Sequence, residues 1–250
     1  KVLVHDVVSW NALIAGYAQN GLGNEALECF THMQKSGIRP NDVTYICILK
    51  ACGIVGSLWI GEEIEVEIRN QGLLEKNIVL GTALVDMYAK CGELAKACEV
   101  LKELPLQDVI SWSTLIMGYA QLGHGKKAFE LLDEMRQAKF EPNQVTYLSI
   151  LKGCSLSTAL QQGRLVHGQI MRSGIELDNS IGNALVDMYS KCGAMQKAYE
   201  VFEKLPEWSV VSWSSLIAGY SQLGQANVVL NLYSRMITEG IVPNSVTFIV

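Results

Sequence analysis

The sequence predicts an all-α fold, a right-handed α-solenoid built from stacked helix-turn-helix repeats. Three observations predict it: long internal repeats, apolar stripes at helical spacing, and glycine or proline where each helix should end. One hairpin of this size cannot bury its own apolar stripe. Successive hairpins must therefore stack, and they should leave a concave inner surface on which a ligand would lie.

The clearest repeat is a segment that occurs three times. It reads VVSWNALIAGYAQNG from Val7, VISWSTLIMGYAQLG from Val109 and VVSWSSLIAGYSQLG from Val210, at spacings of 102 residues (7 to 109) and 101 residues (109 to 210). Between these copies, ALVDMYAKCG matches ALVDMYSKCG, and VTYICILKAC matches VTYLSILKGC. Each long period therefore holds three related subunits of about 31 to 36 residues, the size of a helical hairpin.

Each of the three copies predicts two helices separated by a glycine. Apolar residues recur at i, i+3, i+4 and i+7 in the first helix: Trp10, Leu13, Ile14, Tyr17; Trp112, Leu115, Ile116, Tyr119; Trp213, Leu216, Ile217, Tyr220. Gly21, Gly123 and Gly224 should break this helix, and a second stripe follows at Ala26, Phe30, Met33; Ala128, Leu132, Met135; Val229, Tyr233, Met236. Gly37 or Gly240, and then Pro40, Pro142 or Pro243, should end the second helix. Gly16, Gly118 and Gly219 lie inside first helices at a cost of about 1 kcal/mol each, which predicts close helix-to-helix approach there.

The composition fits a folded protein and limits the kinds of site it can carry. The chain has 250 residues, of which 49% are hydrophobic and 18% charged, and no apolar run long enough to span a membrane, so no membrane partner is expected. Its formal net charge of −5 argues against a nucleic-acid binder that depends on phosphate contacts. The chain begins without Met and stops within a repeat, so we expect a fragment, with any targeting peptide outside it.

The cysteines are odd in number and form no C-x-x-C pair, which suits neither a disulfide framework nor a zinc site. We interpret them as small buried apolar residues in a reducing compartment, and expect no metal and no cofactor. They are Cys29, Cys47, Cys52, Cys91, Cys98, Cys154 and Cys192.

These repeated strings resemble the pentatricopeptide repeat family of plant organelles, in particular its subclass in which P-, L- and S-type repeats alternate. The resemblance covers essentially the whole chain, as one continuous array. P-type units resemble 7–41, 109–143 and 210–244; L-type units 42–77 and 144–178; S-type units 78–108 and 179–209; 1–6 would end an earlier S-type unit, and 245–250 would begin another L-type unit. The unit 42–77 is one residue longer than 144–178, in GLLEKN, which we expect to displace Asn77 slightly.

The resemblance implies sequence-specific binding of single-stranded RNA, one base per repeat, by a protein that is not itself an enzyme. In the family the fifth and last residues of each repeat read the base; here they are Asn11 with Asn41, Thr82 with Asp108, Ser113 with Asn143, Asn183 with Ser209, and Ser214 with Asn244. The L-type pairs, Ile46 with Asn77 and Leu148 with Asp178, should discriminate poorly, because Ile46 and Leu148 cannot hydrogen-bond. Second residues would sandwich the bases, in a series that Ser180 breaks: Val8, Val43, Val79, Ile110, Val145 and Val211.

By the same resemblance, Ser with Asn favours adenine, Thr with Asp favours guanine, and Asn with Asn favours a pyrimidine. Asn183 with Ser209 departs from the usual S-type ending in Asp, and we expect it to prefer a pyrimidine as well. The resemblance also implies a role in organellar RNA processing, in particular C-to-U editing, in a mitochondrion or chloroplast. Protein partners of an editing complex could bind through L- and S-type units, and no DNA partner is expected.

Two structural alternatives compete with these roles. Asn11, Ser113 and Ser214 could be simple helix N-caps, although Ser9, Ser111 and Ser212, two residues earlier, are better placed to cap. The apolar second residues could equally be ordinary core.

Two other functions compete with RNA binding. An enzyme is disfavoured. In GYAQLGHGK, His124 stands where a phosphate loop needs Lys, and no Ser or Thr follows. No H-x-E, P-C-x-x-C, G-x-S-x-G or H-E-x-x-H string occurs either. His167 matches Glu65 of the other L-type unit, so we interpret it as structural or as a surface residue.

A scaffold that binds a protein or peptide on its concave face is the more serious rival, and the acidic charge balance favours it. Short polar residues at the paired positions favour RNA, because a peptide groove more often presents Arg, Lys or aromatic anchors.

Overall fold

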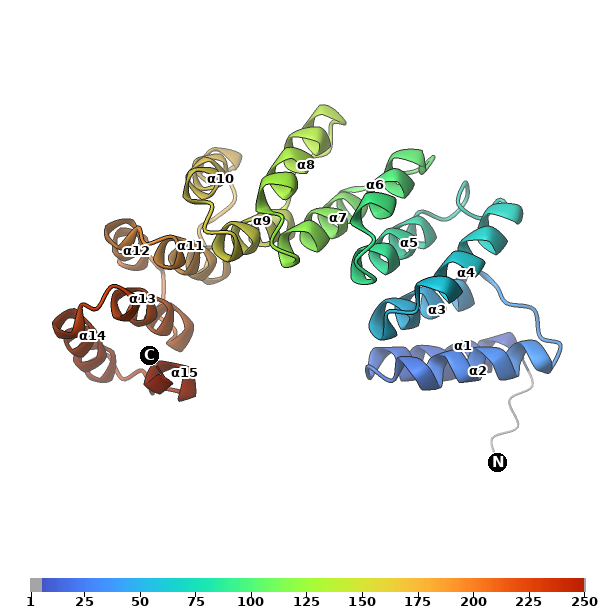
Figure 1. Ribbon diagram of the computed structural model, residues 1–250, viewed down its shortest axis with the longest axis horizontal. Coiled ribbons are helices and arrows are strands. Elements are labelled where there is room, and N and C mark those ends of the chain that lie inside the picture. The colour runs from blue at the N-terminus through green and yellow to red at the C-terminus, as the bar shows by residue number, and fades with distance from the viewer. Residues whose placement is uncertain (1–5, 250) are drawn as a thin grey trace. The chain divides into compact units, whose positions relative to one another are not determined.

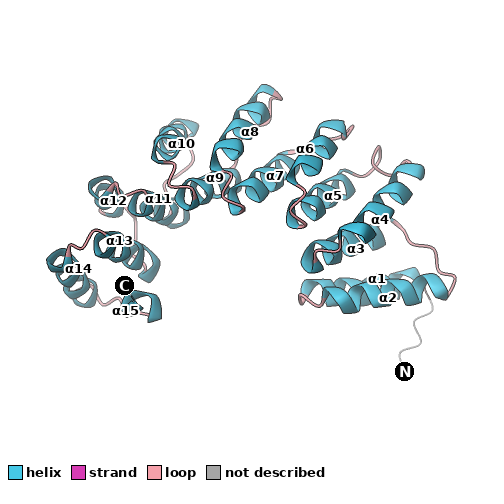
Figure 2. Cartoon of the chain, in the orientation of Figure 1, coloured by secondary structure: helices cyan, strands magenta, loops and turns pink. Residues whose placement is uncertain are grey.

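The computed structural model describes residues 6–249, and every regular element in that range is a helix. Figures 1 and 2 show the helices following one another as hairpins joined by short loops. The helices are α1 (Val7–Gln19), α2 (Gly23–Lys35), α3 (Asp42–Val55), α4 (Leu58–Asn70), α5 (Ile78–Lys90), α6 (Leu94–Glu103), α7 (Val109–Gln121), α8 (Gly125–Gln137), α9 (Gln144–Leu156), α10 (Leu160–Ser173), α11 (Asn179–Lys191), α12 (Met195–Phe202), α13 (Val210–Gln222), α14 (Ala226–Thr238) and α15 (Ser245–Ile249).

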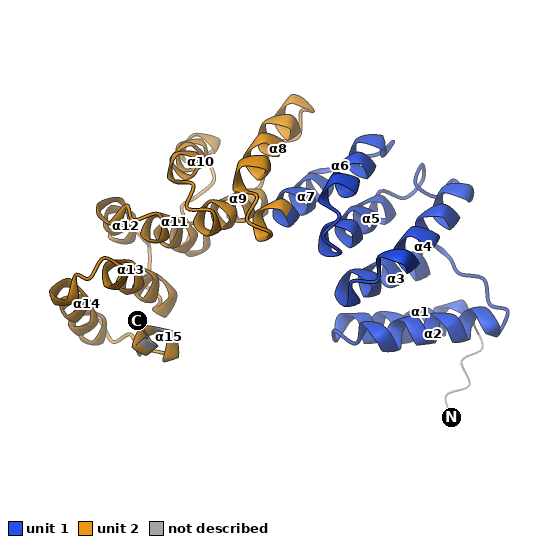
Figure 3. Cartoon of the chain, in the orientation of Figure 1, with its two compact units in different colours: residues 1–118 blue, residues 119–250 orange. Residues whose placement is uncertain are grey.

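The chain divides into two compact units, residues 1–118 and 119–250, with the boundary inside α7 (Figure 3). In the first unit, α1, α3 and α5 pack side by side, and α2 and α4 each contact the first helix of their own hairpin and of the next. In the second unit, α9, α11, α13 and α15 form the corresponding row, flanked by α8, α10 and α12. Each unit is thus two layers, one of first helices and one of second helices, as expected of stacked hairpins.

Each first helix begins at the first residue of a predicted repeat unit, from Val7 to Ser245. The assignment of these units to P, L and S types stays a prediction. The segment 1–6, apart from Asp6, lies outside the described residues, as does Val250. No helix in the described range is both long and apolar enough to cross a membrane.

The apolar stripes form the core, as predicted. Ile14, Trp112, Leu115 and Trp213 are buried in first helices, and Ala26, Met33 and Met135 in second helices. Leu13 is 38% exposed, because no hairpin packs against that side of α1 among the described residues. Six other stripe residues are half-buried: Trp10, Tyr17, Tyr119, Tyr220, Val229 and Tyr233. Gly21, Gly123 and Gly224 end their helices with φ of 77°, 79° and 68°, a conformation that only glycine adopts without strain.

The prediction for glycines inside the first helices is correct at two positions and wrong at one. A Cβ on Gly118 would lie 2.9 Å from Ala89 Cβ, and one on Gly219 would lie 2.9 Å from Ser190 Cβ, so in both places the preceding hairpin packs against the backbone. A Cβ on Gly16 meets nothing within 4 Å. The reason is that no hairpin precedes α1 in the described range.

The cysteines are all free, and the expectation that all are buried is only partly correct. Cys52 and Cys154 are buried, whereas the other five are half-buried. Burial raises the pKa of Cys52 and of Cys154 to about 12, so these thiols stay protonated near neutral pH. No group of three or more His, Cys, Asp or Glu side chains in residues 6–249 is arranged to hold a metal ion.

Candidate nucleic-acid interface

The last residue of each predicted repeat is the N-cap of the next first helix. Its side-chain oxygen accepts a hydrogen bond from the backbone N–H three residues later, which satisfies one of the free donors at the helix start. The acceptors and distances are Asn41 (3.0 Å), Asn77 (3.2 Å), Asp108 (2.7 Å), Asn143 (3.0 Å), Asp178 (2.9 Å), Ser209 (3.3 Å) and Asn244 (3.1 Å). One short polar side chain is therefore held in the same way at the start of every first helix from α3 to α15.

This finding corrects the expected caps. Ser9, Ser111 and Ser212 are the third residues of their helices, and their backbone N–H groups donate to Asp6, Asp108 and Ser209. The hydroxyls of Ser111 and Ser212 in turn accept from the backbone N–H of the capping residue, which completes a capping box. The alternative that Asn11, Ser113 and Ser214 are caps is also wrong, because all three lie inside the helix.

The fifth residues lie in the second turn of each first helix and are largely covered. Asn11, Ser113 and Ser214 are 8%, 3% and 5% exposed, and Thr82 and Asn183 are half-buried. The Ser113 and Thr82 hydroxyls donate to backbone carbonyls four residues earlier, at 2.7 Å and 3.1 Å. The L-type residues Ile46 and Leu148 are half-buried at the same place.

Three of the predicted base-reading pairs are connected by hydrogen bonds, each pair within a single compact unit. Asn11 Nδ2 donates to Asn41 Oδ1 at 3.0 Å, and Asn183 Nδ2 donates to Ser209 Oγ at 3.3 Å. Ser214 is joined to Asn244 indirectly, because its hydroxyl lies 2.9 Å from Thr247 Oγ1, which donates to Asn244 Oδ1 at 3.1 Å. These contacts place the fifth and last residues of a repeat within reach of one small ligand group.

In the described range, Thr82 and Asp108 are not joined by a hydrogen bond. Thr82 and Asp108 each bond only to their own helix start.

In the units 42–77 and 144–178 the last residue is hydrogen-bonded to the first residue of the same unit, a contact that the sequence pattern does not predict. Asn77 Nδ2 donates to Asp42 Oδ2 at 2.8 Å, and Gln144 Nε2 donates to Asp178 Oδ2 at 2.7 Å. Asp42 and Gln144 are the first helical residues of these units. Asn77 and Asp178 cap α5 and α11 alike, so the extra residue in GLLEKN is accommodated in the turn before Asn77.

The apolar second residues are exposed, and the alternative that they are core is wrong. Their exposed fractions are 69% for Val8, 47% for Val43, 56% for Val79, 62% for Ile110, 48% for Val145 and 54% for Val211, and Ser180 is exposed at the equivalent place in α11. Each lies at the second residue of a first helix, beside the capping side chain. A row of exposed β-branched side chains has no role in the hydrophobic core and is available to contact a ligand.

The first helices carry few charges. α1, α7 and α13 have none, and the Asp86–Lys90 pair of α5 and the Asp187–Lys191 pair of α11 neutralise themselves, at 2.7 Å and 2.9 Å. α3 carries Asp42 and the exposed Lys50, and α9 carries the exposed Lys152. A ligand on this layer would therefore meet mainly uncharged groups, with single lysines rather than a continuous basic track.

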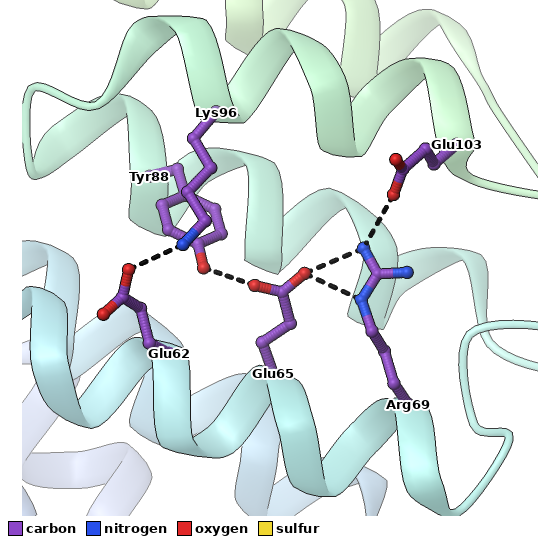
Figure 4. Close-up of polar contacts among 6 residues, drawn as sticks. All are labelled: Glu62, Glu65, Arg69, Tyr88, Lys96 and Glu103. Atoms are coloured by element: carbon purple, nitrogen blue, oxygen red, sulfur yellow. Dashed lines mark hydrogen bonds and ion pairs between the residues drawn. The ribbon is translucent and has the colours of Figure 1, made fainter.

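The charged residues gather on the second helices, where one seam between α4 and its neighbours α5 and α6 is fully paired (Figure 4). The buried Glu65 accepts from the Tyr88 hydroxyl and from Arg69 Nε, the latter at 2.8 Å, and Arg69 Nη2 also lies 3.2 Å from Glu103. Lys96 Nζ lies 2.6 Å from Glu62. Burial and the adjacent Glu65 raise the pKa of Tyr88 above its ordinary value. The network is structural, because its buried groups satisfy one another.

In the unit 144–178 a histidine, His167, stands at the place of Glu65. His167 Nδ1 lies 2.9 Å from the Tyr189 hydroxyl, as Glu65 lies beside Tyr88. Burial, together with Lys197 and Lys204, lowers the pKa of His167 below its ordinary value. The imidazole is therefore neutral near pH 7, which supports the structural interpretation.

These hairpins, with a polar pair at the start of successive first helices, define the chain as a helical-repeat protein of the α-solenoid class. Models of the PPR repeat family match residues 5–53, 107–155 and 208–250, and a model of the PPR repeat matches 82–108 and 183–210. The chain belongs to the PPR, or pentatricopeptide repeat, family.

Relatives agree with this assignment, and a solved structure shares the fold. A chloroplastic pentatricopeptide repeat-containing protein of Arabidopsis thaliana is 40% identical over 235 residues, 94% of this chain and 38% of that protein. A mitochondrial one from the same plant is 39% identical over 241 residues, 96% of this chain and 23% of that protein. The pentatricopeptide repeat protein PPR10, in complex with an 18-nt psaJ RNA element, matches with a TM-score of 0.79 and 23% identity over 98% of this chain and 37% of PPR10. This chain therefore spans about two fifths or less of these proteins.

Proposed function

We propose that this chain binds single-stranded RNA in a sequence-specific way, one base per repeat, without doing chemistry itself. The observation that carries the proposal is the regular placement of a capping polar side chain, an exposed apolar second residue and a fifth residue at the start of successive first helices. The RNA complex of PPR10, which shares the fold, supports RNA as the ligand. The chloroplastic and mitochondrial relatives support an organellar location.

The geometry suggests how a base would be read. An Asn or Asp cap uses one side-chain oxygen to hold its helix, which leaves an amide group or a second carboxylate oxygen for a Watson–Crick edge. The exposed second residues of neighbouring repeats would cover the faces of the base. In Asn77 and Asp178 that remaining group is already hydrogen-bonded, to Asp42 and to Gln144 respectively. This supports weak discrimination between bases by the L-type units.

With the N-terminal repeat at the 5′ side, the pairs specify pyrimidine, any base, G, A, any base, C, A. Thr82 with Asp108 would read the G, and Ser113 with Asn143 and Ser214 with Asn244 would read the two adenines. We further propose that the whole protein is an organellar RNA-processing factor, in particular one used for C-to-U editing. The rival, a peptide scaffold on the first-helix layer, lacks Arg, Lys or aromatic anchors at the paired positions.

A gel shift with single-stranded RNA tests the proposal. The protein should bind the seven-base pattern in preference to the same bases in scrambled order, and affinity should fall only shallowly as salt is raised, because few phosphates are neutralised. Equal affinity for both RNAs would overturn base reading. A steep salt slope would point to backbone contacts instead.

A further inference from the structure

A groove on the second-helix side of the first unit has no part in the proposed RNA site. It lies between α2 and α4, which Figure 1 shows in neighbouring hairpins, and encloses about 590 Å³. Phe30 and Ile64, both nearly buried, form part of its wall, and Trp59, Glu63 and Glu67 of α4 line it from one side. Because hairpins add along the array, a groove between two consecutive second helices is not a place where another repeat stacks.

Trp59 is the residue that makes this groove unusual. Its side chain is 63% exposed, whereas Trp112 and Trp213 are buried in the core. Tryptophan is among the residues that dominate the binding energy of many protein interfaces. At the equivalent place in the other L-type unit the chain has Gln161, so the fold does not require tryptophan here.

The groove is also acidic. Glu28, Glu63 and Glu67 line it, and no Lys or Arg does. Within residues 6–249, Glu28 and Glu63 form no ion pair, unlike the neighbouring Glu62. The equivalents of Glu63 and Glu67 in the other L-type unit are Leu165 and Gln169. The tryptophan and two of the carboxylates therefore occur together in one copy of the repeat and are absent from the other.

We propose that this groove binds a cationic segment of a partner protein, one in which arginines alternate with apolar residues. A guanidinium can lie over the face of Trp59 while it bonds to Glu63 or Glu67, and an apolar side chain can contact Phe30 and Ile64. Nucleic acid does not suit the groove, because three carboxylates would repel its phosphates. The RNA-reading positions are on the first helices, so the groove and the RNA site can be occupied independently.

Fluorescence anisotropy with a labelled ten-residue peptide of alternating arginine and leucine tests the proposal. Two variants carry the residues of the other L-type unit, Trp59→Gln and the pair Glu63→Leu with Glu67→Gln, so both should fold. Each should weaken peptide binding by about tenfold or more. The control pair, Glu25→Gln with Glu75→Gln, removes the same charge from exposed sites outside the groove and should leave binding within about twofold of the parent protein.

Several results would overturn the proposal. The proposal is wrong if the peptide shows no saturable binding, if the groove pair and the control pair lose peptide affinity equally, or if RNA competes with the peptide for the groove. A peptide of alternating glutamate and leucine should not bind. RNA affinity should be unchanged in Trp59→Gln, so failure of the groove proposal and failure of the RNA proposal give different patterns.

Discussion

Val79 and Ser180 are the second residues of α5 and α11, and they allow the sandwiching role to be tested in both directions. Val79 is 56% exposed, so about half of its side chain remains to be covered by a ligand. Complete burial of a valine contributes about 1.5–3 kcal/mol, which leaves about 1–1.5 kcal/mol for a base to gain. Val79→Ala should therefore weaken RNA binding by about five- to tenfold. Ser180→Val should strengthen it by a similar factor.

Neither change should alter folding, because an exposed substitution away from a cap usually shifts the free energy of unfolding by no more than about 0.5 kcal/mol. Urea unfolding of both variants gives that control, and filter binding to the seven-base RNA gives the affinity. The reasoning is refuted if RNA affinity ignores both changes. It is also refuted if Val79→Ala unfolds at a markedly lower urea concentration, since Val79 would then be a core residue.

Four further substitutions test the packing and the buried polar groups. Gly219→Ala should lower the free energy of unfolding by about 1–3 kcal/mol, because its Cβ would lie 2.9 Å from the Cβ of Ser190. Gly16→Ala should raise it by about 0.5–1 kcal/mol, because nothing lies within 4 Å of its Cβ. Equal effects of the two changes in urea unfolding would contradict the close contact at Gly219. Tyr88→Phe removes a partner of the buried Glu65 and should cost about 1–3 kcal/mol in the same assay, and a neutral result would mean that water replaces the hydroxyl. The fold lowers the pKa of His167, so its stabilising contribution is present above its ordinary pKa of 6.5 and is lost as pH falls. Between about pH 7 and about pH 5, the melting temperature of His167→Gln should therefore fall less than that of the parent protein. An equal fall in both proteins would exclude the effect.

The sequence predicts the helices and their stacking well because both follow from periodicity. Trp213 and Met135 lie on their predicted stripes and are buried. Gly16 shows the limit of this reasoning: it matches Gly118 in the sequence, yet nothing packs against it. What a residue contacts depends on its neighbours in space, and among the described residues no hairpin precedes α1.

The candidate site was harder to predict in detail. Serine is a good N-cap by type, but Ser111 is the third helical residue. The cap is Asp108, so α7 begins three residues earlier than a cap at Ser111 would give. The Asp42–Asn77 and Gln144–Asp178 contacts join residues about a repeat apart, and no local pattern reveals them. The Thr44 capping box could have been found, since Asn-x-x-Thr before an apolar run is a helix-start signal.

The most direct test of base reading exchanges two neighbouring specificities. Asp108→Asn and Asn143→Asp together keep both helix caps, because Asn and Asp cap equally well. The parent protein should prefer G then A at the third and fourth bases, and the double variant should prefer A then G. If the two proteins rank these RNAs in the same order, the capping residues do not read bases.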